Sequence, residues 1–400
     1  MFLLSNKITA LKESATLAMA RKSRELKARG KKIINLSLGE PDFDTPDFIK
    51  EAAKKAIDNN FSKYTPVPGY KELLEVISEK FKRDNNLIYN SNQIVCSTGA
   101  KQSIAQLLMV LLNKNDEVIL PAPYWVSYHQ MIRLAEGNPY ILKTDMESDF
   151  KITPDQLKKA ITKKTKVFLF SSPCNPSGSV YNHDELYELA QVFKKYKNII
   201  IISDEIYEHI NFNQQHISIG SIKEISDQVV TINGLSKGFA MTGWRFGYLG
   251  APQKIAEACI KMQGQITSAT CSITQRAAIT ALSEKPQFTK EMCNIFEKRR
   301  NLMIKLLSEI KGLKLNTPKG AFYIFPDISH YIGKKHKDKY IHNANDLSMF
   351  LLEDAGVATV SGDAFGVENH IRISYAASDL ELKQACELIK NSLKKLNYEI

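Results

Sequence analysis

Several apolar, strand-like segments of this sequence end in residues that can do chemistry. Lys237 follows one such segment and is surrounded by small residues, and Arg245 comes shortly after it. Asp204 follows a run of isoleucines, and Asn175 lies in an Asn-Pro turn after another apolar run. Burial disfavours the charged form of a lysine and leaves its lone pair available. A buried Lys237 is therefore suited to form a Schiff base with an aldehyde.

A glycine turn, Thr98 to Lys101, follows a fourth strand-like segment and leads into a helical pattern. Such a turn presents free backbone N–H groups and the positive end of a helix dipole, which suits a phosphate. Taken singly, these features are more often structural, because such turns usually only connect elements and Asp204 would equally serve as a helix cap or a paired buried charge.

The convergence of these strand ends changes the interpretation. In an open parallel sheet, ligands bind beyond the carboxyl ends of the strands, so the four segments point at one crevice. A lysine for an aldehyde, a carboxylate facing a pyridine nitrogen, and a helix N-terminus with Arg and Ser facing a phosphate together describe a site for pyridoxal 5′-phosphate.

The elements that must position these residues alternate between helix and strand from about residue 50 to 285. Short Val- and Ile-rich runs bounded by Gly, Pro, Asn and Asp predict strands buried on both faces. Their alternation with helices predicts an α/β fold with a mostly parallel, doubly wound sheet. The predicted strands are 93–99, 116–121, 166–172, 198–205 and 228–233, and the predicted helices are 47–59, 70–85, 100–113, 128–134 and 183–196.

The pattern changes from about residue 286, where a smaller α+β domain is predicted. Its predicted helices are 288–310, 345–356 and 379–396, and its predicted strands are 320–326, 357–362 and 370–376. Residues 1–46 show no core of their own, so we expect them to fold back on this part of the chain. We predict a large cofactor-binding domain at 47–285, and a small domain with an N-terminal arm formed by 1–46 and 286–400.

Composition narrows the class of protein. The chain has 400 residues, 44% apolar and 24% charged, as in ordinary globular enzymes, with a formal charge of +11. The lysines are spread along the whole chain and no nucleic-acid reader motif is present, so we expect no nucleic-acid partner. The six cysteines show no metal-ligand spacing, so we predict no metal. Without a signal-peptide pattern or a long apolar segment, we expect a cytoplasmic protein that does not span a membrane.

Motifs across nearly the whole chain resemble those of fold-type I, class I aminotransferases, in the bacterial aspartate/prephenate aminotransferase subgroup. They occur in the family's order. The motifs are GEPDFDTP (39–46), KYTPVPGY (63–70), PAPYWVSY (121–128), SPCNPSG (172–178), SDEIYEH (203–209), SKGFAMTGWRFGY (236–248), GAFY (320–323) and IRISYA (371–376).

This resemblance implies how the residues hold pyridoxal phosphate. Lys237 is implied to carry the cofactor as a Schiff base and later to move a proton between the substrate α-carbon and the cofactor. Asp204 is implied to keep the pyridine nitrogen protonated. Asn175 and Tyr207 are implied to hydrogen-bond the phenolic oxygen, and Trp125 to stack on the ring.

The resemblance also implies the phosphate site and the assembly. The implied phosphate-binding residues are Ser236, Arg245 and the backbone of Gly99, Ala100 and Lys101. Tyr64 is implied to reach a phosphate in the partner subunit, so a homodimer with shared active sites is expected. Ala100 stands where the family usually has a second glycine, which is tolerated if its φ is negative.

The same resemblance implies the substrate contacts. An Arg in an apolar strand pattern usually snorkels to the surface, but Arg372 matches the family's clamp on the substrate α-carboxylate, with Gly39 beside it. Trp125 and Asn175 are implied to contact substrate as well. The candidates to meet a second carboxylate are Lys12, Ser14, Thr16 and Lys101, although Lys12 alone would be an ordinary surface lysine. Glu13 replaces the usual proline, and Cys174 has no assigned role.

The expected reaction is transamination from aspartate to 2-oxoglutarate, which gives oxaloacetate and glutamate. The subgroup also implies activity with prephenate, which would give arogenate. The alternatives are an aminotransferase of aromatic or alanine specificity and a carbon–sulfur lyase of the same fold. A nucleic-acid-binding protein that reuses the fold is a further alternative, prompted by the net charge of +11.

Overall fold

A seven-stranded sheet forms the centre of the protein, in a computed structural model that describes residues 3–212, 215–283 and 287–398. The strand order is β2-β8-β7-β6-β5-β3-β4, and all neighbours are parallel except β8, which is antiparallel to both β2 and β7. The strands are β2 (Ile94–Ser97), β3 (Glu117–Ala122), β4 (Asn138–Lys143), β5 (Thr165–Ser171), β6 (Ile200–Asp204), β7 (Val229–Gly234) and β8 (Gly247–Gly250). The predicted α/β class with a mostly parallel sheet is confirmed.

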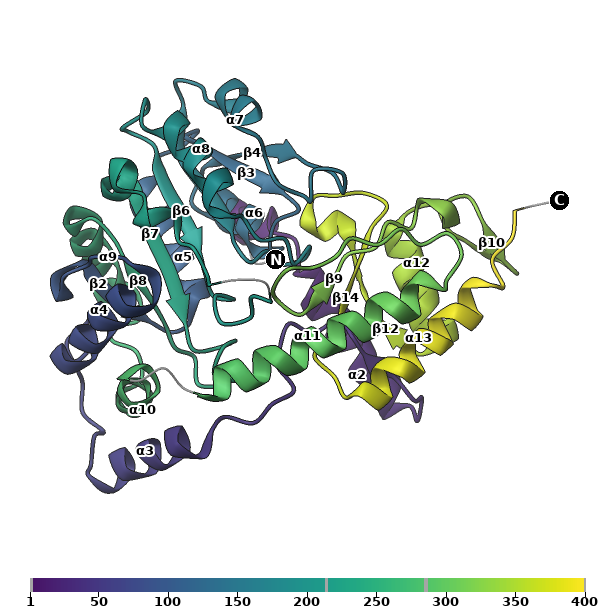
Figure 1. Ribbon diagram of the computed structural model, residues 1–400, viewed down its shortest axis with the longest axis horizontal. Helices are drawn as coiled ribbons and strands as arrows, with labels where there is room; N and C mark the ends of the chain where they lie inside the picture. Colours follow the sequence, from purple (N-terminus) through teal and green to yellow (C-terminus); the bar gives the residue numbers. More distant parts are fainter. Residues whose placement is uncertain (1–2, 213–214, 284–286, 399–400) are drawn as a thin grey trace.

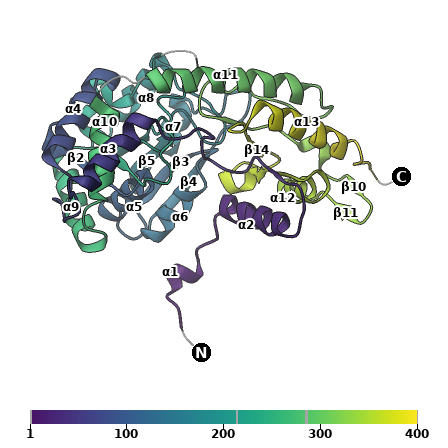
Figure 2. The same cartoon turned by 90° about the horizontal axis from the view of Figure 1, so that it is seen from below.

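Helices cover both faces of this sheet (Figures 1 and 2). One face packs against α5 (Ala100–Leu111), α6 (Ser127–Leu134) and α9 (Gln253–Ile266). The other packs against α4 (Lys71–Asn85) and α10 (Ser272–Ser283) at one end and α7 (Pro154–Ala160) and α8 (His183–Phe193) at the other, and α3 (Asp47–Asp58) lies on α10. Side chains along each strand alternate between the two cores, as the period of two requires. Val95 thus joins one core, and Ile94 and Cys96 join the other.

A second unit is built mainly from the C-terminal part of the chain. Helix α11 (Gln287–Ser308) runs from the first unit along the second (Figure 1). A three-stranded antiparallel sheet has the order β13-β14-β9. The elements are β9 (Tyr323–Ile324), β10 (Lys335–His336), β11 (Lys339–Tyr340), α12 (Ala344–Phe350), β12 (Val357–Ala358), β13 (Val360–Ser361), β14 (Ile371–Ser374) and α13 (Asp379–Leu393). Short helical turns are η1 (Ser91–Gln93), η2 (Ile219–Ser221), η3 (Lys223–Gln228), η4 (Ser329–Tyr331), η5 (Leu351–Ala355) and η6 (Gly362–Phe365).

The N-terminal segment joins this second unit. β1 (Ile34–Asn35) pairs in parallel with β12, and α2 (Ala15–Ala28) packs on the same unit. α1 (Asn6–Thr9) stands away from the body of the chain (Figure 2). The predicted domain boundary between residues 285 and 286 lies outside the described residues, so the domain division stays a prediction. In the described part of the chain, no helix combines the length and the apolar character that crossing a membrane requires.

Candidate active site

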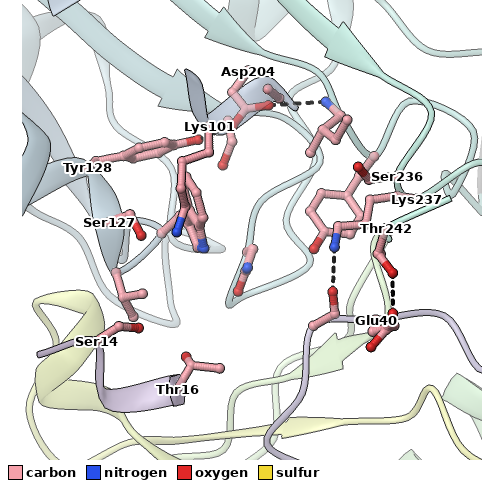
Figure 3. Close-up of a pocket in the computed structure, with 18 of the residues that line it drawn as sticks. Ser14, Thr16, Glu40, Lys101, Ser127, Tyr128, Asp204, Ser236, Lys237 and Thr242 are labelled. Atoms are coloured by element: carbon pink, nitrogen blue, oxygen red, sulfur yellow. Dashed lines mark hydrogen bonds between the residues drawn. The ribbon is translucent and has the colours of Figure 1, made fainter. Parts of the chain in front are cut away.

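The carboxyl ends of β5, β6 and β7 open into one cavity of about 370 Å³ that also borders the second unit (Figure 3). Most of the residues singled out in the sequence line it. They are Ser14, Thr16, Gly39, Ala100, Lys101, Trp125, Asn175, Asp204, Tyr207, Ser236, Lys237, Arg245 and Arg372. Side chains up to 358 positions apart in the sequence are thus brought together, from Ser14 to Arg372.

Lys237 lies just beyond β7 with its amine in the cavity. Nζ donates a hydrogen bond to the Gly39 carbonyl and lies 5.9 Å from the centre of the Tyr207 ring. Burial lowers the pKa of Lys237 to about 8; the nearby Glu40 carboxylate opposes this shift, and Arg372 and Arg245 add to it. Near pH 8 about half of the molecules therefore carry a neutral amine, which is the form that attacks an aldehyde or accepts a proton.

Asp204 ends β6 and is 4% exposed. Its Oδ2 accepts a hydrogen bond of 2.5 Å from the Tyr128 hydroxyl, and its Oδ1 accepts one of 3.2 Å from the Ile206 backbone N–H. Burial raises the pKa of Asp204 to about 6, although both hydrogen bonds act to lower it. The carboxylate is mostly ionised at neutral pH, in a place where a cationic partner would stabilise it.

A helix N-terminus and an arginine meet where α5 begins. Gly99, with φ of 87°, precedes the helix, and among the described residues no side chain caps its N-terminus. The Arg245 guanidinium lies against Gly99: a Cβ added to Gly99 would lie 2.4 Å from Arg245 Nη2. Arg245 Nη1 donates to the Thr242 carbonyl at 2.8 Å, which fixes the guanidinium in place. The helix N-terminus and this cation together suit a phosphate.

Arg372 on β14 is 1% exposed. Its Nη1 donates to Asn175 Oδ1 at 2.9 Å and its Nη2 to the Ser37 carbonyl at 2.5 Å, whereas Nε has no partner in the part of the chain that the structure describes. The guanidinium carbon lies 4.5 Å from the centre of the Tyr323 ring. Burial lowers the pKa of Arg372 from its ordinary value. A buried guanidinium that none of the described carboxylates pairs with is suited to an incoming carboxylate.

Comparison with known proteins agrees with this geometry. Residues 31–389 match the family model described as aminotransferase class I and II. The chain belongs to this family.

The relatives of this aminotransferase cover nearly its whole length. A probable aspartate/prephenate aminotransferase of Rickettsia bellii is 46% identical over 389 residues, which are 96% of this chain and 98% of that protein. An aspartate/prephenate aminotransferase of Cereibacter sphaeroides is 45% identical over 393 residues, 98% of each chain. The crystal structure of the aspartate aminotransferase from Rhizobium meliloti superposes with a TM-score of 0.96 at 38% identity, over 99% of this chain and 100% of that one. The predicted family and fold, and an aminotransferase activity, are confirmed.

Three of the predicted site residues of the aminotransferase lie outside the cavity wall. Gly99 lies behind the Arg245 guanidinium. Lys12 lines a second cavity of about 640 Å³, which shares Ser14, Lys101, Val126 and Ser127 with the first. Tyr64 is 98% exposed and does not touch either cavity. A single chain therefore does not test the predicted roles of Lys12 and Tyr64.

The departures from the family pattern have local explanations. Ala100 is the first residue of α5, and a helical residue has negative φ, so alanine fits there. Glu13 pairs with Arg21 at 3.0 Å on the exposed surface, so its charge is balanced locally. Cys174 lies 3.5 Å from the Pro123 carbonyl oxygen and does not line the main cavity.

Two tyrosines of the site were given no role in the sequence analysis. Tyr128 donates to Asp204, and the Tyr323 hydroxyl lies 2.6 Å from the Tyr207 hydroxyl. Both lie in motifs that carry the family resemblance, PAPYWVSY and GAFY. Those motifs were the available signal, but neither spacing nor periodicity indicates which hydroxyl meets which partner.

Proposed function

We propose that this aminotransferase binds pyridoxal 5′-phosphate and transfers the amino group of aspartate to 2-oxoglutarate, giving oxaloacetate and glutamate. We further propose that it converts prephenate to arogenate. The observation that carries the proposal is one cavity lined by a partly buried lysine, Lys237, a buried carboxylate, Asp204, and an arginine, Arg372, that pairs with none of the described carboxylates.

The residues present fit pyridoxal phosphate. The Gly99 corner with Arg245 and Ser236 suits its phosphate, and the Asp204 carboxylate suits its pyridinium nitrogen. Asn175 and Tyr207 offer hydrogen bonds for the phenolic oxygen, and Trp125 offers a flat face for the ring. When bound, the cofactor supplies an electron sink that stabilises the negative charge left on the substrate α-carbon.

The chain's own groups would carry the proton transfers. Lys237 Nζ, with its pKa lowered to about 8, would accept the proton from the substrate α-carbon and release it again. Asp204 would hold the proton on the pyridine nitrogen, because an ionised carboxylate favours a cation beside it. Asp204 is buried and Lys237 is partly buried in this cavity, which limits the access of bulk water to these protons.

Substrate recognition would rest on two sets of groups. Arg372, whose Nε has no hydrogen-bond partner among the described residues, would take the α-carboxylate, next to Gly39. On the other side, Thr16 Oγ1 is buried with no partner among the described residues, and Lys101 pairs with none of the described carboxylates. With Ser14 and Lys12, these groups suit a second carboxylate. The names of the relatives, which include aspartate and prephenate, agree with dicarboxylic substrates.

We also propose that the protein is a homodimer whose Tyr64 reaches the phosphate site of the partner subunit. Tyr64 is 98% exposed in the single chain, which is unusual for an aromatic side chain. Exposed apolar side chains on α3 and α9 accompany it, among them Phe48, Ile57 and Ile266. A partner subunit would cover such side chains. A cytoplasmic location stays a prediction.

The test is a comparison of amino donors on the purified holoenzyme. Aspartate, phenylalanine, alanine and cystathionine are each supplied with 2-oxoglutarate, and prephenate is supplied as acceptor with aspartate or glutamate as donor. We expect the highest kcat/KM with aspartate, and arogenate from prephenate. A preference for phenylalanine or alanine would overturn the proposed specificity, and release of pyruvate and ammonia from cystathionine would favour a lyase.

A further inference from the structure

Tyr128 occupies a fixed place directly beside Asp204 (Figure 3). It is the second residue of α6 and is 1% exposed. Its hydroxyl donates to Asp204 Oδ2 at 2.5 Å, and its backbone N–H donates to the Trp125 carbonyl at 2.9 Å. The hydroxyl therefore has one defined acceptor, which lies 76 positions away in the sequence and at the end of another element.

The ring of Tyr128 is held as firmly as its hydroxyl. It meets the Trp125 indole edge-on, with ring centres 5.3 Å apart and an angle of 83° between the planes. It also belongs to the core between α5, α6 and the sheet, together with Ile202 on β6. One side chain thus fixes the carboxylate that ends β6 relative to the indole that precedes α6.

The charges around this pair explain what the hydroxyl contributes. Asp204 faces the like charge of Glu205, which raises its pKa, and the Lys237 ammonium, which lowers it. Burial and the Asp204 charge hold the pKa of Tyr128 well above its ordinary value, and Cys174 is its other titratable neighbour. Tyr128 therefore keeps its proton and donates it, and such a hydrogen bond favours the ionised form of the acceptor.

We propose that Tyr128 is a positioning residue that holds Asp204 as a carboxylate turned toward the cofactor site. The inference rests on the proposed function, because it gives Tyr128 a role only through the group that Asp204 binds. Without the hydroxyl, Oδ2 would be a buried acceptor with no donor among the described residues, and Asp204 would stay protonated to a higher pH. A protonated Asp204 loses its attraction for a pyridinium nitrogen.

The test is the Tyr128→Phe variant, which keeps the ring and removes only the hydroxyl. The measurement is the dissociation constant of pyridoxal phosphate from pH 5 to 9, by absorbance titration of the cofactor-free enzyme. In both proteins, cofactor binding is expected to weaken at low pH as Asp204 becomes protonated; we call this part of the pH profile the acid limb. In the variant, the acid limb is expected to lie about one pH unit higher or more. At pH 7 the dissociation constant should rise severalfold, and kcat should fall while KM for aspartate changes by less than about twofold.

Tyr181→Phe is the matched control. Tyr181 is also buried, and its hydroxyl accepts a hydrogen bond of 3.0 Å from the Ile152 backbone N–H, so that removing this hydroxyl takes no hydrogen bond from the Asp204 carboxylate. The control should keep the wild-type acid limb, and thermal unfolding should show both variants folded. The inference is overturned if Tyr128→Phe keeps the wild-type limb, or if both variants shift it equally. The proposed function survives either result as long as the wild-type enzyme binds the cofactor and transaminates aspartate.

Discussion

The stability of the cofactor-free enzyme is expected to rise when Asp204 is replaced by Asn. Burial raises the pKa of Asp204 from an ordinary value of 3.8 to about 6. A shift of roughly two units corresponds to about 3 kcal/mol, at 1.36 kcal/mol per unit. This free energy is the cost of keeping the carboxylate ionised in the folded chain without the pyridinium cation that we propose it binds.

The sign of the pH dependence follows from linkage. The folded-state pKa of this acid lies above its unfolded value, so the folded chain binds the proton more tightly. The destabilisation is absent below about pH 4, grows as the pH rises through 6, and is fully present above. Asparagine has a similar shape and no charge. The free energy of unfolding of Asp204→Asn at pH 7.5 should therefore exceed that of the wild type by about 2–3 kcal/mol, and this difference should shrink toward pH 4.5.

Urea unfolding of the cofactor-free wild type and variant, at pH 7.5 and 4.5, measures this difference. Asp145→Asn is the control, because the Ser148 backbone N–H and hydroxyl lower the pKa of Asp145 and no gain is expected there. Activity should be lost in Asp204→Asn at both pH values. A variant no more stable than wild type at pH 7.5, or a gain independent of pH, would refute the assignment of Asp204 as a carboxylate whose burial outweighs its hydrogen bonds.

Three further experiments test other parts of the site. Arg372→Lys should lower kcat/KM for aspartate roughly 100-fold, because a buried bidentate clamp is lost; a steady-state value within threefold of wild type would contradict this. Gly99→Ala should weaken cofactor binding about tenfold, because φ is 87° and the new Cβ would meet Arg245 Nη2 at 2.4 Å; absorbance titration checks it, and an unchanged dissociation constant argues against it. Tyr64→Ala mixed with Lys237→Ala should regain activity through hybrid dimers with one intact site; no recovery in subunits shown to exchange would exclude a shared site.

The central strands were predictable because their burial on both faces leaves a continuous apolar run. β5, β6 and β7 are such runs, and their alternation with helices fixed the fold class. β8 was not predicted, since it has four residues, two of them glycine, and depends on antiparallel pairing with β2 and β7. β4 was missed as well, because it contains Pro139 and lies at the sheet edge with little burial.

The predictability of the site residues depended on where each lies in the fold. Lys237, Asp204 and Asn175 follow parallel strands, so strand order alone brought them to one edge. Arg372 needed the family resemblance, because its burial against Tyr323 and Phe365 is a tertiary contact that an apolar strand pattern does not reveal. The hydrogen bond from Tyr128 to Asp204 likewise depends on how α6 packs on the sheet. The places of Tyr64 and Lys12 require a partner subunit or a bound substrate.

The most direct test of the account is to locate the amine that holds the cofactor. Borohydride fixes pyridoxal phosphate to that amine, and mass spectrometry of a digest identifies the modified residue. The account predicts the modification on Lys237 and none on Lys101, which lines the same cavity and whose pKa burial also lowers. Modification of Lys101 instead, or of neither lysine, would contradict it.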